Sequence, residues 1–235
     1  MPSRSMIDEE NKLTNDETFE TGDLESIVSR IASYLNEQYN LRESTLTLSR
    51  DIIRLSGQAV RFIHRLDFDK ALKKIEEAKI KVDEINKKLE KYPELKDKGF
   101  ISSAYQEYAE ANLLFSLLKY KKFVSFEALD VPCVSYLLGL GDLIGELRRH
   151  ILDSIRREDI EKAESLLDLM EEVYTLLMTI DYPEALTSGL RRKCDVARSL
   201  VEKTRGDITL AIQNKQLIKK MQDLSELLGG KKDEI

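Results

Sequence analysis

Apolar residues recur at intervals of three and four along most of the chain, a spacing that predicts long amphipathic helices. The pattern becomes helical at residue 23 and predicts a first helix over 23–66. Asp67 has the side chain of a helix cap and predicts the start of a second helix. Tyr92-Pro93 ends that helix, because the residue before a proline disfavours helical backbone.

The remainder of the chain shows the same periodicity, interrupted by short polar or proline-containing breaks. It predicts helices over 101–120, 132–156, 160–179 and 183–212, and a last segment over 216–228. Neither an alternating strand pattern nor an internal repeat is visible. The sequence therefore predicts an all-α fold, an antiparallel bundle of about seven helices.

The chain ends differ in composition from the helical middle. Residues 1–22 are polar and acidic, which predicts a flexible N-terminal arm, and 229–235 form a charged, flexible tail. Residues 23–228 are expected to form a single helical domain. No apolar run reaches the roughly 18 residues that span a bilayer, and no secretory signal is visible, so we expect no membrane association and a cytoplasmic location. The two cysteines, Cys133 and Cys194, fit a reducing interior.

The net charge of −6 argues against a general affinity for nucleic acid, because phosphate contacts need clustered Lys and Arg. Any such role must therefore depend on local basic patches. The candidate RNA-binding residues lie near the end of the first helix and on the sixth: Arg50, His64, Arg65, Arg191, Arg192 and Arg198. The alternative is structural, since each of these residues could instead pair with a nearby acid.

Two acidic pairs lie within apolar sequence. Glu107 and Glu110 precede an almost wholly apolar stretch, and Asp142 and Glu146 are the charged residues of 136–147. With 43 acidic residues in 235, acidic pairs at helical spacing are common by chance, and solvated or salt-bridged faces are the ordinary interpretation. Burying carboxylates is costly, however, unless something compensates the charge.

If the two helices turn these pairs toward each other, four carboxylates converge. Small residues on the same stripe as Asp142 and Glu146, namely Ser135 and Gly139, are expected to leave room beside them. Such a cluster would take up protons or bind a hard cation, Mg²⁺ or Mn²⁺. A divalent ion held in this way can polarise a phosphoryl oxygen and activate water.

Several segments together resemble the translin superfamily, and more closely its TRAX branch, the translin-associated factor X proteins. The resemblance spans about residues 24–217 and is carried by Leu48-Ser49-Arg50-Asp51-Ile52, Ile63-His64-Arg65, Gln106-Glu107-Tyr108-Ala109-Glu110-Ala111 and the segment from Tyr136 to Leu147. The long polar insertion that eukaryotic TRAX carries between its third and fourth helices is nearly absent, and so is a basic nuclear-targeting segment. Both departures indicate a compact prokaryotic-type member.

The resemblance implies a seven-helix bundle that assembles into a hollow, octamer-like homo-oligomer. It implies a Mg²⁺-dependent endoribonuclease acting on single-stranded or short duplex RNA, with single-stranded DNA as a further ligand. The TRAX acidic quartet maps onto Glu107, Glu110, Asp142 and Glu146, as both catalytic residues and metal ligands. The alternative is a non-catalytic shell that binds single-stranded RNA or DNA, as translin does.

Overall fold

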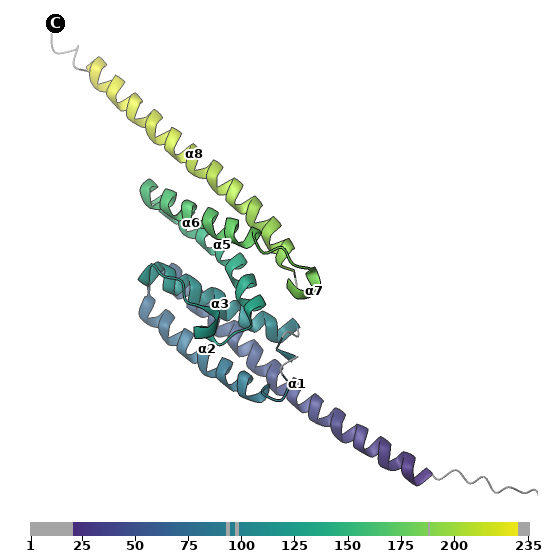
Figure 1. Ribbon diagram of the computed structural model, residues 1–235. Helices are drawn as coiled ribbons and strands as arrows, with labels where there is room; N and C mark the ends of the chain where they lie inside the picture. The colour runs from purple at the N-terminus through teal and green to yellow at the C-terminus, as the bar shows by residue number, and fades with distance from the viewer. Residues whose placement is uncertain (1–20, 93–94, 97–98, 188, 230–235) are drawn as a thin grey trace, which may run out of the picture. The chain divides into compact units, whose positions relative to one another are not determined.

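The computed structural model describes residues 21–92, 95–96, 99–187 and 189–229, and all regular structure in this part of the chain is helical (Figure 1). The all-α prediction is therefore confirmed. The expected N-terminal arm, save for its last two residues, and the tail beyond Gly229 lie outside the described residues. The helices are α1 (Thr21–His64), α2 (Phe68–Lys88), α3 (Gly99–Tyr120), α4 (Phe126–Leu129), α5 (Cys133–Arg156), α6 (Ile160–Met178), α7 (Glu184–Thr187) and α8 (Leu190–Gly229).

The chain divides into two compact units, residues 1–43 and 44–235, so the division falls within α1. The described part of the first unit is helical and leaves its apolar side chains exposed, among them Leu24, Ile27 and Ile31. None of the described helices combines the length and the apolar composition needed to cross a membrane.

Helix α5 forms the centre of the second unit, because it packs against α3, α6 and α8. Its residues Leu143, Ile144, Leu147 and Ile151 have no exposed surface. Burial of each such side chain stabilises the fold by about 1.5–3 kcal/mol. Since α5 is held on several sides, its polar residues have fixed orientations relative to the neighbouring helices.

Two helices begin at the aspartate caps that their sequences favour. Asp67 accepts a hydrogen bond from the Lys70 amide at 3.2 Å, as predicted, and Asp159 does the same for the Lys162 amide at 3.2 Å. Each cap satisfies an amide that the first helical turn leaves without a partner.

The prediction was wrong about the C-terminal helices. The segments 183–212 and 216–228 were expected to be separate, but α8 is one helix of 40 residues, from Leu190 to Gly229. The residues between the two expected segments, Gln213-Asn214-Lys215, are polar but continue the helix, and they are exposed. Pro183 precedes the short helix α7 instead of beginning the long one.

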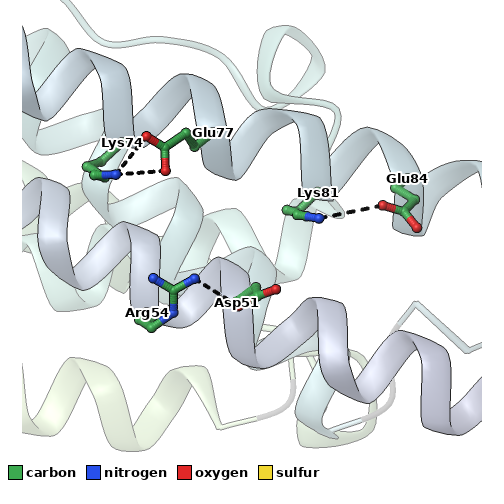
Figure 2. Close-up of polar contacts among 6 residues, drawn as sticks. All are labelled: Asp51, Arg54, Lys74, Glu77, Lys81 and Glu84. Atoms are coloured by element: carbon green, nitrogen blue, oxygen red, sulfur yellow. Dashed lines mark hydrogen bonds and ion pairs between the residues drawn. The ribbon is translucent and has the colours of Figure 1, made fainter.

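Charged residues on α1 and α2 pair with neighbours on their own helix (Figure 2). Lys74 and Glu77 lie 2.6 Å apart, Lys81 and Glu84 lie 4.0 Å apart, and Arg54 and Asp51 lie 2.9 Å apart. Exposed pairs of this kind contribute about 0.3–0.5 kcal/mol each. The charged face of α2 is therefore solvated, as its sequence indicated.

A buried polar network joins α2, α3 and the turn before α5. The Tyr105 hydroxyl donates to Asn86 Oδ1 at 2.5 Å, and Asn86 Nδ2 donates to the Asp130 carbonyl at 2.8 Å and to Asp130 Oδ2 at 2.9 Å. Tyr105 is fully buried and Asn86 nearly so. Loss of a buried partner is costly because the remaining groups have no water to bind.

We expect Asn86→Ala to lower the free energy of unfolding by about 2 kcal/mol, because it leaves the buried Tyr105 hydroxyl without its acceptor and removes the contact with Asp130. Urea denaturation followed by circular dichroism measures the change, with the exposed neighbour variant Lys87→Ala as control. Equal midpoints for the Asn86 variant and the unmodified protein would show that the network contributes no stability.

Candidate active site

Helices α3 and α5 come into close contact at Gly139. A Cβ atom at this position would lie 3.0 Å from Ala109 Cβ, 3.0 Å from the Gln106 carbonyl oxygen and 3.1 Å from the Glu110 amide nitrogen. Ser135, one turn earlier, is buried and lies 3.1 Å from Ser102 Oγ. The expectation that Ser135 and Gly139 leave open room is therefore wrong, because α3 fills that space.

This contact brings the two acidic pairs into one cluster. Helix α3 supplies Glu107 and Glu110, and α5 supplies Asp142 and Glu146. The negative charges of Asp142 and Glu146 act on both glutamates of α3. The charges of the two pairs therefore act on one another across the contact between α3 and α5.

Glu110 occupies the most buried position of the cluster, with 8% of its surface exposed. Burial is the largest cause that raises its pKa to about 9, and the charges of Asp142, Glu107 and Glu146 raise it further. Burial and then Asp142 also raise the pKa of Glu107. Within the described part of the chain, the Glu110 carboxyl makes no hydrogen bond or ion pair. Such a group needs a proton or a cation.

Asp142 is held by one residue from α3 and one from α8. Gln106 Nε2 donates to its Oδ2 and Lys193 Nζ to its Oδ1. The lysine stem lies close to α5, because a Cβ atom at Gly141 would be 3.2 Å from Lys193 Cβ. Asp142 is therefore oriented by a neutral donor on one oxygen and an ammonium on the other.

Glu146 is held by the end of α1. His64 Nε2 contacts Glu146 Oε2, and this hydrogen bond is the main cause that lowers the pKa of Glu146. The His64 ring stacks on that of His150, with centroids 4.5 Å apart. Burial, then the charge of His64, lowers the pKa of His150 to about 4, so His150 is neutral near pH 7. The two rings fix the orientation of the carboxylate.

The predicted RNA-binding residues occupy different surroundings. The His64 side chain is 4% exposed, which favours support of Glu146 over direct contact with RNA. Arg50 is exposed on α1, and Arg65 is exposed in the turn that follows this helix. Arg191 lies 3.9 Å from Asp181, and Arg198 lies 3.1 Å from Glu202. Of the six predicted residues, Arg192 alone lines a groove beside the acidic cluster.

That groove, which we call the α5–α8 groove, has a volume of about 430 Å³. It is lined by Gln106, Leu138, Gly141, Asp142, Gly145, Gly189, Arg192, Lys193, Val196 and Leu200. It thus adjoins the cluster at Asp142 and opens along the first turns of α8.

The donor set of the cluster suits a hard divalent cation, because carboxylate oxygens are the ligands that Mg²⁺ and Mn²⁺ prefer. The buried, unpartnered Glu110 is the feature that fits such an ion best. As the side chains stand, no three His, Cys, Asp or Glu among the described residues are arranged to hold a metal ion. Lys193 and His64 instead contact two of the four carboxylates.

Two supporting residues were missed in the sequence. Lys193 was not assigned to the site, because its partner Asp142 lies 51 positions away in the sequence. His150 had a detectable signal, since it follows Asp142 and Glu146 on α5 at intervals of four. That spacing places all three side chains on one face of the helix.

Comparisons with known proteins identify relatives over most of the chain. Residues 40–205 match the model of the translin family. An uncharacterized protein from Methanocaldococcus jannaschii is 38% identical over 194 residues, which cover 80% of this chain and 83% of that protein.

Solved structures with the same fold include C3PO proteins. The chain is similar to AfC3PO, alone and in complex with duplex RNA, with 30% identity, a TM-score of 0.70 and coverage of 80% of this chain and 98% of that one. It is also similar to apo-NeC3PO, with 25% identity, a TM-score of 0.71 and coverage of 78% and 96%.

We expect Gly139→Ala to destabilise the protein by about 1–3 kcal/mol, because the added methyl group would push α5 away from α3. Gly206→Ala on α8 is the matched control. Nothing lies within 4 Å of a Cβ atom there, so the change should stabilise the helix by about 0.5–1 kcal/mol. Urea denaturation of both variants tests the contact, and equal effects would contradict it.

The raised pKa of Glu110 makes stability depend on pH. The folded-state pKa of Glu110, about 9, lies above its ordinary value of 4.5. Its contribution to the free energy of unfolding is therefore fully present below pH 4.5 and is lost as the pH rises through 9. Glu110→Gln keeps the neutral form at every pH. In EDTA, the two proteins should unfold at similar urea concentrations at pH 5, and the variant should be the more stable at pH 9. Parallel pH profiles would exclude a buried, neutral Glu110.

Proposed function

The chain belongs to the translin family, and we propose that it is a divalent-metal-dependent endoribonuclease that cleaves single-stranded or short duplex RNA. The observation that carries the proposal is Glu110, a buried carboxyl without a partner among three other acids. The similarity to AfC3PO, a structure of which contains duplex RNA, supports RNA as the ligand class.

In this proposal Glu107, Glu110, Asp142 and Glu146 would hold Mg²⁺ or Mn²⁺. The ion would polarise a phosphoryl oxygen of the strand and lower the pKa of a bound water. The four acids match the quartet that the resemblance to the TRAX branch implies, and we propose on this basis that the chain is of that type.

The chain's own side chains prepare the carboxylates for this task. Gln106 and Lys193 fix both oxygens of Asp142, and His64 fixes Glu146. Hydrogen bonds to ligating carboxylates hold them in position and tune their affinity for the ion. Arg50, Arg65, Arg191, Arg192 and Arg198 would bind the phosphates of the strand.

We further propose that the chain acts as a hollow, octamer-like homo-oligomer in the cytoplasm and also accepts single-stranded DNA. An inward-facing basic surface would let an acidic chain bind RNA. The distal part of α8 exposes an apolar series suited to contact between copies: Leu210, Leu217, Ile218, Met221 and Leu224.

A second function, a non-catalytic shell that holds single-stranded nucleic acid, is favoured by one observation. Lys193 and His64 already contact Asp142 and Glu146, so these acids could serve structure alone. Under this alternative, RNA binding would not depend on divalent ions and no fragments would form.

The decisive variants are Glu110→Gln and Asp142→Asn. We expect each to lower the rate of RNA cleavage by about a hundredfold or more, because each removes a charged ligand oxygen. Cleavage of a labelled RNA is followed on gels with Mg²⁺, Mn²⁺ or EDTA, while light scattering and filter binding monitor assembly and RNA affinity.

Glu164→Gln, a change of an exposed acid on α6, is the control and should cleave normally. Unchanged cleavage by either decisive variant would refute the catalytic assignment. If the chain binds RNA but produces no fragments with any divalent metal, the result would support the second function, a non-catalytic shell.

A further inference from the structure

We propose that the α5–α8 groove is a nucleotide subsite, which takes one nucleoside monophosphate unit of the RNA strand. The proposal rests on the proposed function for its biological setting, but binding of a nucleotide to the groove can be measured without cleavage. Shape, charge and position each support it.

The shape of the groove suits a flat ring with its sugar. Its volume of about 430 Å³ lies within the range of about 300–1,000 Å³ that is usual for small-molecule sites. The Lys193 stem covers Gly141 on α5, since a Cβ atom there would be 3.2 Å from Lys193 Cβ. Gly145 is more open, because a Cβ atom there would be 3.9 Å from Leu200 Cδ1, an ordinary contact distance, so the space beside it is where a ring would lie. Leu200 and Val196 supply the apolar wall on α8.

The charge of the groove suits a phosphate. Lys193 and Arg192 both line it, but Lys193 is paired with the carboxylate of Asp142, so Arg192 supplies the positive charge that remains for a phosphate. Arg192 is exposed and, within the described part of the chain, has no acidic partner, whereas Arg191 and Arg198 each lie near an acid. A guanidinium free of ion pairs can bind a phosphate through two parallel hydrogen bonds.

The position of the groove links it to the acidic cluster. Asp142 belongs to both, and Gln106 lines the groove while donating to Asp142. A nucleotide bound here would therefore fix which phosphate of the strand lies beside the carboxylates. Apart from Gln106, Asp142 and the two cations, the groove is lined by apolar residues and glycine, so it should discriminate little between bases.

Calorimetric titration of the full chain in EDTA tests the subsite directly. The probes are adenosine 5′-monophosphate and uridine 5′-monophosphate, with adenosine and inorganic phosphate as separate arms. We expect both nucleotides to bind with similar Kd and more tightly than either fragment, because ring and phosphate are held together.

Two variants examine the two halves of the groove. Arg192→Ala should weaken nucleotide binding about tenfold, the loss of one charge-assisted contact. Val196→Phe should weaken it at least as much, because the larger ring fills the apolar wall. Arg156→Ala on α5 and Ile80→Phe on α2 are the matched controls, since both positions are exposed and outside the groove, and both should bind normally.

The outcomes separate the subsite from the proposed function. Nucleotide binding that neither groove variant weakens, or no binding at all, would overturn the subsite even if the chain cleaves RNA. Binding that both groove variants weaken would support it even if no cleavage is found. In a chain that cleaves RNA, the same variants should also raise KM more than they lower kcat.

Discussion

The candidate site depends on how closely two helix backbones approach each other at Gly139. A helix normally keeps its neighbours away with side chains, so contact between backbones requires a residue without one. Here that contact falls beside the turn that carries Glu110. Acidic side chains that would otherwise reach solvent are therefore confined in a narrow, partly dry space. The unfavourable charge of the cluster is a direct consequence of good packing nearby.

The structure counters this repulsion with residues that are distant in sequence. Lys193 of α8 contacts Asp142, and His64 at the end of α1 contacts Glu146. Glu110 receives no such contact and is the carboxyl whose pKa is raised to about 9. Charge compensation is thus unequal within the cluster. The inner carboxyl remains the one most responsive to a proton or a divalent ion.

The helices and the two acidic pairs could be predicted because each depends on local spacing, whereas the grouping of the four acids was implied by the family resemblance. Apolar periodicity located the long helices, and the position of Asp67 located a cap. The contact between α5 and α8 could not be predicted, because no local pattern links Asp142 to a lysine 51 residues away. Gly139 was recognised as small but interpreted as open space, since a sequence does not tell whether a neighbour fills the room that a glycine leaves. The continuity of α8 was missed because polar residues in the middle of an exposed helix resemble those of a loop.

The unbroken length of α8 has a structural consequence. Forty residues of α-helix extend for about 60 Å as one continuous element. Lys193 stands in its first turn, whereas the exposed leucines stand far along it. A molecule that binds the far end of α8 therefore binds the same continuous helix that places the Lys193 ammonium at Asp142.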